Sequence, residues 1–505
     1  MDFVSVILFL ILYYLRPQEW PLGLASVSFV RWTMLAGLAS LTMRERGFNL
    51  RSLFRTPHDW AVLAFWLWIV FSTPDSKWDT FKETVNLYVF YIVIVQALYS
   101  VERMNKFVGW WTFTICAIAG LALLSLYGFD PLESLNLTKG VMKDRLILNL
   151  SIFNNPNALG HSVVPAIPLL YYFCIWKKPM VLRLLGVCLM VMVGYCIFLT
   201  VSKGAFLAGA ATFVATATFG RPKSVQAIIV CAALFFGTNG LSLLPRMGEL
   251  KKTKTDEAIQ GRVMAFTHGM KVRSTTGIGY RNWYQSFLAG KYHFKRTKFD
   301  KDSLKRPMPI VSKAPHSSYV CIGAELGYVG FFLHMGILYC GLRTLLSART
   351  STPDEERIRR ILFVLTVSYM VSSWVIDFEY RPTFFMFAAA AAALHRHLHK
   401  LNDGPEKKAP EDNLAPLQPA VPAWRARLVP QPALEGAFAQ AGAPVAVLTM
   451  EPAPTPGRIP EPAPEPQPVS GIAFAWNRIG WLDLAVTLAM SYAGIRYWDH
   501  LIQTM

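Results

Sequence analysis

Residues 181–219 read VLRLLGVCLMVMVGYCIFLTVSKGAFLAGAATFVATATF, and this stretch decides the fold. It holds two apolar segments, 181–200 and 203–219, separated only by Val201 and Ser202. A helix that crosses a bilayer needs about 20 apolar residues, and an isolated strand in lipid leaves its backbone polar groups unsatisfied. The stretch therefore predicts two membrane-spanning helices joined by a very short turn.

The same pattern extends over most of the chain. The 505 residues are 53% hydrophobic and only 16% charged, whereas an ordinary soluble domain is roughly 25% charged. These features predict an all-α polytopic membrane protein with about twelve transmembrane helices. The predicted helices cover residues 3–15, 22–42, 59–73, 84–99, 107–127, 157–176, 181–200, 203–219, 224–244, 318–342, 360–376 and 382–396.

Basic residues in the short loops set the expected orientation. Every basic short loop follows an even-numbered segment, and loops rich in Lys and Arg stay in the cytoplasm. We therefore expect a cytoplasmic amino terminus and a long outer, periplasmic loop at 245–317. The basic residues of the short loops are Arg44, Arg46, Arg51, Arg55, Arg103, Lys106, Lys177, Lys178, Arg183, Arg221, Lys223, Arg343, Arg349, Arg357, Arg359, Arg360, Arg396 and Lys400.

The long loop is itself strongly basic. Between Pro245 and His316 it carries sixteen Lys and Arg against five Asp and Glu. A basic loop between apolar segments should meet an anionic partner at the membrane. Phosphates of lipid carriers or anionic headgroups of the membrane lipids suit it better than nucleic acid.

The composition changes after the last of these segments. Residues 401–470 are rich in Pro, Ala, Glu and Gln, and such a stretch cannot bury a core, so we expect a disordered cytoplasmic tail. Within 471–505, a last apolar run at 479–495 contains Asp483. This run is either an additional membrane helix or an interfacial amphipathic helix. The expected domains are a membrane-embedded unit at 1–400, the tail, and this C-terminal helix.

Three residues on the predicted outer side are candidates for chemistry. Lys203 lies at the turn between two segments, and Arg262 and His316 lie near the two ends of the long loop. Cationic side chains can stabilise a diphosphate that leaves as an anion, and a neutral imidazole can accept the proton of an acceptor hydroxyl. The alternatives are a snorkelling interfacial lysine for Lys203 and solvated loop positions for the other two.

Two further charged residues have more than one interpretation. Arg31 lies well within the second apolar segment, so it should face a cavity or an ion-pair partner unless the segment boundary is misplaced. Glu325 follows His316 by nine residues and either orients that histidine, pairs with a loop arginine or is interfacial.

Some residues have the composition of a metal site. Asp300 with Asp302 and Asp377 with Glu379 are spaced carboxylates, but the first pair lies among lysines and the second at a short outer turn. The cluster at 395–399, HRHLH, ends a helix on the expected cytoplasmic side and is interpreted as an anchor. We therefore assign no metal.

Short motifs in a fixed order resemble the O-antigen ligase and polymerase superfamily over roughly residues 1–400. His316-Ser317, nine residues, then Gly327-x-x-Gly330 matches the ligase pattern of His, then Asn, Ser or Gln, nine residues and Gly-x-x-Gly. The heptapeptide YLRPQEW at 14–20 is similar to the exosortase-associated O-glycosylation ligase branch. The other motifs are FNNPNALG at 153–160, SKG at 202–204, GR at 261–262 and GIGY at 277–280.

The resemblance implies a catalytic role for His316, with Arg262 and Lys203 at the diphosphate. Lys203 stands where the family usually has arginine, and lysine keeps the charge but lacks the planar fork that binds two phosphate oxygens. The family's Arg-x-x-x-Leu element fits Arg246 literally, whereas Phe266 follows Arg262 by four residues, so Arg246 is the reserve for Arg262. The candidate substrate-binding residues are Arg31, Arg246, Glu325 and Arg16.

The resemblance also implies a function. It predicts a ligase-type glycosyltransferase of the bacterial inner membrane that moves a glycan from undecaprenyl diphosphate to an acceptor hydroxyl on lipid A core, protein or glycan at the periplasmic face. No metal or other cofactor is expected. A polymerase of the same superfamily is the nearest alternative. A lipid-linked glycan transporter would show inverted repeats and broken helices, and no clear repeat is present; a scaffold is compatible with the Pro-rich tail alone.

Overall fold

The computed structural model describes residues 2–20, 29–43, 53–74, 76–132, 145–240, 257–290, 293–294, 308–309, 314–399, 476 and 479–504. Residues 1–402 and 476–505 form one compact unit, to which all elements below belong. The predicted tail at 401–470, Arg246, Asp300 and Asp302 lie outside the described residues, so those predictions are not tested here.

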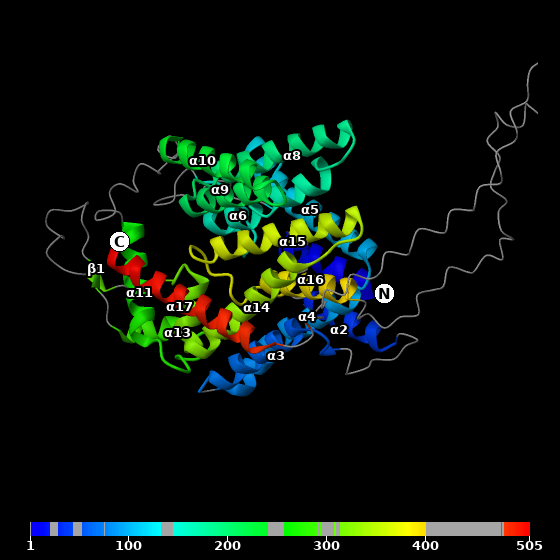
Figure 1. Cartoon of the computed structure of the whole chain (residues 1–505). Helices are drawn as coiled ribbons and strands as arrows, with labels where there is room; N and C mark the ends of the chain where they lie inside the picture. The colour runs from blue at the N-terminus through cyan, green and yellow to red at the C-terminus, as the bar shows by residue number, and fades with distance from the viewer. Residues whose placement is uncertain are drawn as a thin grey trace, which may run out of the picture. The chain divides into compact units, whose positions relative to one another are not determined.

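Helices make up most of the described chain (Figure 1). Each predicted apolar segment corresponds to one or more helices, which confirms the α-helical class. They are α1 (Asp2–Tyr14), α2 (Phe29–Thr42), α3 (Pro57–Ser72), α4 (Lys77–Ala97), α5 (Val101–Leu124), α6 (Pro156–Val163), α7 (Ala166–Leu170), α8 (Met180–Leu199), α9 (Lys203–Thr218), α10 (Lys223–Gly240), α13 (Ser318–Glu325), α14 (Gly327–Ser347), α15 (Pro353–Ser372) and α16 (Pro382–Leu398).

Four helical stretches among the described residues are long and apolar enough to cross a membrane. They are Val101–Tyr127, Pro156–Ile175, Met180–Leu199 and Gly327–Ser347. Their length and composition are those of a membrane protein. The prediction of about twelve spans goes beyond these four and stays a prediction.

Two of the predicted helices are interrupted. In the segment 157–176, α6 ends at Val163. Pro165 follows, and it has no N–H to donate to a helix hydrogen bond. The short α7 and a π-helical turn, η5 (Tyr171–Ile175), complete the segment. In the segment 318–342, α13 ends at Glu325 and α14 begins at Gly327, whose φ is 68°. At the first interruption the backbone of Val164 and Pro165 stays in the right-handed helical region, whereas the second creates a helix end at Glu325.

The expected long loop at 245–317 is partly helical. It contains α11 (Glu257–Val272), α12 (Trp283–Ala289) and a two-residue antiparallel pair, β1 (His293–Phe294) with β2 (Met308–Pro309). The helices form because this basic stretch also carries apolar residues that bury together, with Phe266, Trp283 and Phe287 packed against Val320 of α13. The described part of 245–317 is therefore largely helical, and its periplasmic location stays a prediction.

The remaining helices pack as a bundle around one large apolar core. α1 packs on α2, α4 on α16, α3 on α14, and α9 on α15. The run Ala388–Ala393 of α16 is buried, and such small side chains let neighbouring helices approach closely. The C-terminal run forms α17 (Trp481–Thr504), which contacts both α14 and α11 (Figure 1).

Candidate functional site

His316 lies just before α13 and faces the loop between α15 and α16. Its Nδ1 atom is 3.9 Å from Oδ2 of Asp377, and the side chains are partly exposed. The other oxygen of Asp377, Oδ1, accepts a hydrogen bond of 2.8 Å from the backbone N–H of Ser317. The carboxylate thus fixes the turn that carries the histidine and also lies beside its ring.

Two serines fasten this turn to the loop. Ser317 caps α13 by accepting the backbone N–H of Val320, while its hydroxyl donates to the carbonyl of Ser373. Ser318 donates its hydroxyl to the carbonyl of Ile376 and accepts the N–H of Phe378. These bonds hold His316 at φ 49°, in the left-handed region that non-glycine residues seldom occupy. A backbone held in that region by its surroundings is typical of functional sites.

Arg262, on α11, acts on the same carboxylate. Although the Asp377 side chain is partly exposed, the atoms packed around its carboxyl desolvate it and raise its pKa to about 6, while the backbone N–H groups of Ser317 and His316 and the charge of Arg262 lower it. The charge of Arg262 also acts on His161 of α6. The charge of Arg262 therefore acts on both the His316 loop and the α6 helix.

Glu379 is a second acid of the same loop. It is 6% exposed, and within the described chain its Oε2 atom is buried without a hydrogen-bond partner. Burial, with the neighbouring charge of Asp377, raises the pKa of Glu379 to about 8. The acid that faces His316 is Asp377, whose Oδ2 atom lies 3.9 Å from Nδ1 of the histidine.

The turn that carries Lys203 packs on α6 and, through it, on α15. Lys203 is the first residue of α9, which Ser202 caps. A Cβ atom on Gly204 would lie 2.9 Å from Nε2 of His161, and His161 bonds through Nδ1 to the hydroxyl of Ser372 at 3.1 Å. Ser372 directly precedes Ser373, whose carbonyl holds the His316 turn. The SKG motif and the histidine motif therefore meet at the same end of α15.

Arg145 is a cation of this region that the sequence reasoning missed. Its guanidinium is buried, with Nε donating to the carbonyl of Thr200 at 2.9 Å and Nη2 donating to Oδ1 of Asn157 at 2.9 Å. It thus joins the FNNPNALG motif to the turn before Lys203. Its position just ahead of that motif, between apolar segments, was the available signal.

The GIGY motif docks by its backbone on the junction of α13 and α14. The N–H of Ile278 donates to the carbonyl of Ala324 at 3.0 Å, and the N–H of Gly279 donates to that of Glu325 at 2.8 Å. A Cβ atom on Gly277 would overlap the carbonyl oxygen of Glu325. The two glycine motifs are therefore partners in space.

Glu325 binds this docked segment. Its Oε1 atom accepts the N–H of Trp283 at 3.2 Å, and Oε2 accepts the hydroxyl of Tyr380 at 3.0 Å. The sequence left three roles open for Glu325: orienting His316, pairing with a loop arginine, or lying at the interface. In the structure its carboxyl group is buried and joins α12 to the loop before α16. These bonds do not show contact with the His316 ring.

The remaining candidates are Arg16 and Arg31. Arg16, at φ 47°, pairs with Glu19, whose carboxylate accepts the backbone N–H of Ser151 at 2.7 Å. Glu19, held by Arg16, thus links the YLRPQEW segment to the loop that leads into FNNPNALG. Arg31 is the third residue of α2, and its side chain is exposed. Residues 21–28 lie outside the described residues, so the alternatives for Arg31 stay open.

The histidine-rich end of α16 is not a surface anchor. Arg396 is 3% exposed, and its Nη2 atom is 2.8 Å from Oδ2 of Asp59. His395 shares the hydroxyl of Thr344 with His58. The anchor interpretation was wrong for these two residues because Asp59 of α3 compensates the buried charge.

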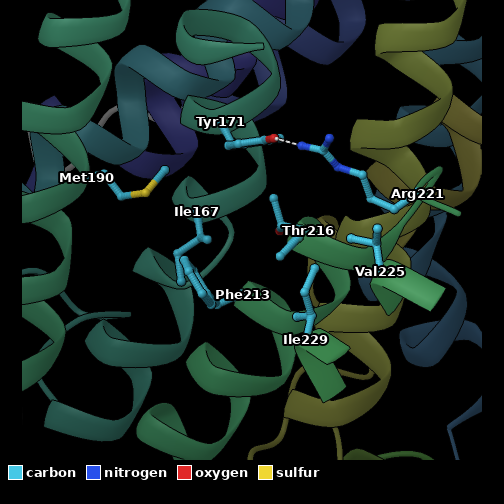
Figure 2. A pocket seen from close by; sticks show the side chains of 9 residues that line it. Ile167, Tyr171, Met190, Phe213, Thr216, Arg221, Val225 and Ile229 are labelled. Carbon is cyan, nitrogen blue, oxygen red and sulfur yellow. Dashed lines mark hydrogen bonds between the residues drawn. The ribbon is translucent and has the colours of Figure 1, made fainter. Parts of the chain in front are cut away.

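A cavity of about 280 Å³ lies far from His316, between α7, α8, α9 and α10. Figure 2 shows Arg221 at its rim, where Nη2 donates to the hydroxyl of Tyr171 at 3.2 Å, with Phe213 and Ile229 among the apolar lining. Its residue Thr216 follows Lys203 on α9 by thirteen positions, a rise of about 20 Å. The cavity is therefore separate from the centre around Asp377.

No family model matches the chain, and no curated protein matches it.

Proposed function

We propose that this protein is a membrane-embedded glycosyltransferase that moves a glycan from undecaprenyl diphosphate to an acceptor hydroxyl. The observation that carries the proposal is the arrangement of His316 beside Asp377, with the charge of Arg262 acting on the same carboxylate. A histidine oriented by a carboxylate is suited to accept a proton, and a nearby cation is suited to a phosphate anion.

The proposed chemistry is a single displacement. The acceptor oxygen attacks the anomeric carbon, the bond between that carbon and the diphosphate oxygen breaks, and undecaprenyl diphosphate leaves with the bonding electron pair. The proton of the acceptor hydroxyl passes to the imidazole nitrogen that faces away from Asp377. Asp377 stabilises the imidazolium that forms, and Arg262 and Lys203 stabilise the departing diphosphate.

The proposal includes the placement in the membrane. The chain would cross the inner membrane of a bacterium about twelve times, with its amino terminus in the cytoplasm and with His316 at the periplasmic end. Support comes from the four stretches that can span a bilayer and from the basic loops at the opposite ends of the helices. The acceptor hydroxyl would belong to lipid A core, a protein or another glycan.

The test is replacement of His316 by alanine in the native host, followed by chemical analysis of surface glycans. We expect loss of glycan transfer, because a general base contributes about 10²–10⁴-fold in rate. His500→Ala is the matched control, since His500 is exposed on α17. Normal glycans on cells with a well-expressed His316→Ala protein would refute the proposal.

The same analysis separates ligase from polymerase. Without a ligase, complete glycans should accumulate on the lipid carrier while acceptors stay bare. Without a polymerase, acceptors should carry single repeat units.

A transporter of lipid-linked glycans is the second candidate. The break in the segment Pro156–Ile175 favours it, because interrupted helices line the binding sites of many transporters. A purified enzyme transfers glycan in detergent with no membrane to cross, whereas a transporter does not. Transfer by purified protein, lost on His316→Ala, would exclude this candidate.

A further inference from the structure

The C-terminal helix α17 connects two parts of the molecule that are distant in sequence. It runs beside α14 and reaches α11, the helix that carries Arg262 (Figure 1). Residues 400–475 lie between the end of α16 and the described part of this C-terminal segment, so α17 belongs to the chain's last segment. Through its contacts, α17 therefore belongs to the packed unit, although none of the motifs at 1–400 includes it.

At one end, α17 is fixed to α14 by a buried acid. Asp483 is 3% exposed and pairs with Arg343, and its Oδ1 atom also accepts the hydroxyl of Tyr339 at 2.7 Å. Its Oδ2 atom accepts the indole N–H of Trp476 at 2.9 Å. A buried carboxylate that is paired in this way strongly resists separation, because undocking would leave one charge unpaired.

At the other end, Trp498 packs into the helix pair α11 and α13. It is 1% exposed, and its indole N–H donates to the carbonyl of Phe266 at 3.2 Å. Its ring is so close to Gly269 and Gly323 that a Cβ atom on either glycine would lie 2.9 Å from the ring. Only glycines at these positions leave room for the indole between the two helices.

A neighbouring charge pair closes the same contact. Arg273, directly after α11, has Nη1 at 3.2 Å from Oδ1 of Asp499, and its guanidinium lies over the Trp498 ring at 5.1 Å. Asp499 is next to Trp498 on α17. The end of α11 is thus held by apolar packing, by a hydrogen bond and by charge.

This contact lies one helical turn from Arg262. Phe266 follows Arg262 by four residues, a rise of about 6 Å. Phe266 also stands where the family-like Arg-x-x-x-Leu pattern has leucine, and here it packs in the cluster that contains Trp498. A shift of α11 away from α13 would therefore carry Arg262 away from Asp377.

We propose that α17 is a clamp that holds α11 against α13, with Trp498 as a positioning residue for Arg262. That the position of Arg262 matters for diphosphate binding rests on the proposed function. The clamp itself rests on the contacts between α17, α11 and α14. Removal of the indole frees α11 to move, while the rest of the bundle keeps its own core.

The test measures amide hydrogen exchange and undecaprenyl diphosphate binding on the full chain in lipid nanodiscs. Trp498→Ala should speed exchange in residues 262–272 by about tenfold or more without a matching change in α3, and should weaken binding by about tenfold. Trp498→Phe should restore part of both. Trp481→Ala is the matched control, because Trp481 lies on the same helix and is 88% exposed.

If the Trp498→Ala protein does not fold, a second pair of variants tests the same contact. Arg273→Asp should loosen α11, and Arg273→Asp combined with Asp499→Arg should restore its protection. Unchanged exchange in α11, equal acceleration in all helices, or wild-type binding in a protein with a loosened α11 would overturn the proposal. If the wild-type chain does not bind undecaprenyl diphosphate while α11 is loosened by these variants, the clamp stands and the proposed function fails.

Discussion

At the scale of single residues, the centre depends on His316 being held in an unfavourable backbone conformation. Its φ of 49° is maintained by the hydrogen bonds of Ser317 and Ser318 to the loop between α15 and α16. Asp377 provides one of these bonds and also faces the imidazole, so the same acid positions the histidine and neighbours its charge. A free loop would leave the histidine in many orientations. Because the folded protein already fixes the histidine, the entropy cost of orienting it is not part of the reaction barrier.

Asp377→Asn should lower the rate of transfer by about tenfold or more, because a neutral amide cannot stabilise the imidazolium. Burial raises the pKa of Asp377 to about 6, so the carboxyl is protonated below this pH and charged above it. The wild-type rate should therefore rise as the pH passes about 6, and the variant should lack this ionisation. The measurement is the pH profile of transfer by purified protein. A wild-type rate with an unchanged profile would contradict the role of Asp377.

Lys203→Ala should raise KM for the lipid-linked donor by about tenfold, whereas Lys203→Arg should keep or improve binding because arginine presents a bidentate fork to phosphate. Steady-state kinetics with varied donor measure both. Lys223→Ala is the control, because Lys223 is the first residue of α10 as Lys203 is of α9, and it is exposed. Normal kinetics for Lys203→Ala would show that this lysine only snorkels to the interface.

At the scale of elements, breaks in helices build the centre. The break between α13 and α14 occurs at Gly327, and the GIGY segment pairs with the carbonyls that this break exposes. Two segments separated by α12 and the β1–β2 pair thus become one packed unit. The last carbonyls of a helix need partners, and here a loop of the same chain supplies them.

Gly277→Ala should destabilise the protein by about 1–3 kcal/mol, since its Cβ would overlap the Glu325 carbonyl and α12 would be pushed from α13. Thermal unfolding in detergent measures the loss. Gly128→Ala is a matched control, because Gly128 also has a positive φ, 87°, but has open space around it. Equal effects of the two substitutions would mean that backbone strain alone, and not docking, matters at Gly277.

At the scale of the whole molecule, buried charges join helices that are far apart in sequence. Arg396 of α16 pairs with Asp59 of α3, and Asp483 of α17 pairs with Arg343 of α14. Each pair is buried at least on one side, so separating its helices would expose an uncompensated charge to an apolar environment. Near the start of α17, Asp483 pairs with Arg343 close to the end of α14. Near the end of α17, Trp498 bonds to Phe266 of α11, so α17 runs along the length of α14.

This path predicts that α17 crosses the membrane. A reporter enzyme that works only outside the cytoplasm should be inactive when inserted at 401–470 and active when fused after Met505. The physical reason is that α17 packs beside α14, which is apolar enough to span a bilayer, and that its 24 residues rise about 36 Å, the length that such a span needs. Equal reporter activity at the two positions would show that α17 lies at the interface instead.

The sequence by itself determined the helical class, the apolar segments and the motifs that meet at one end of α15. These follow from local rules, since apolar length, proline and glycine act on the residues around them. Only the tertiary structure decided that Asp377 faces His316, that Arg145 joins two motifs, that Arg396 is buried and that Trp498 holds α11. Such pairings depend on which side chains meet across the bundle, and the spacing of residues along the chain does not encode which ones meet.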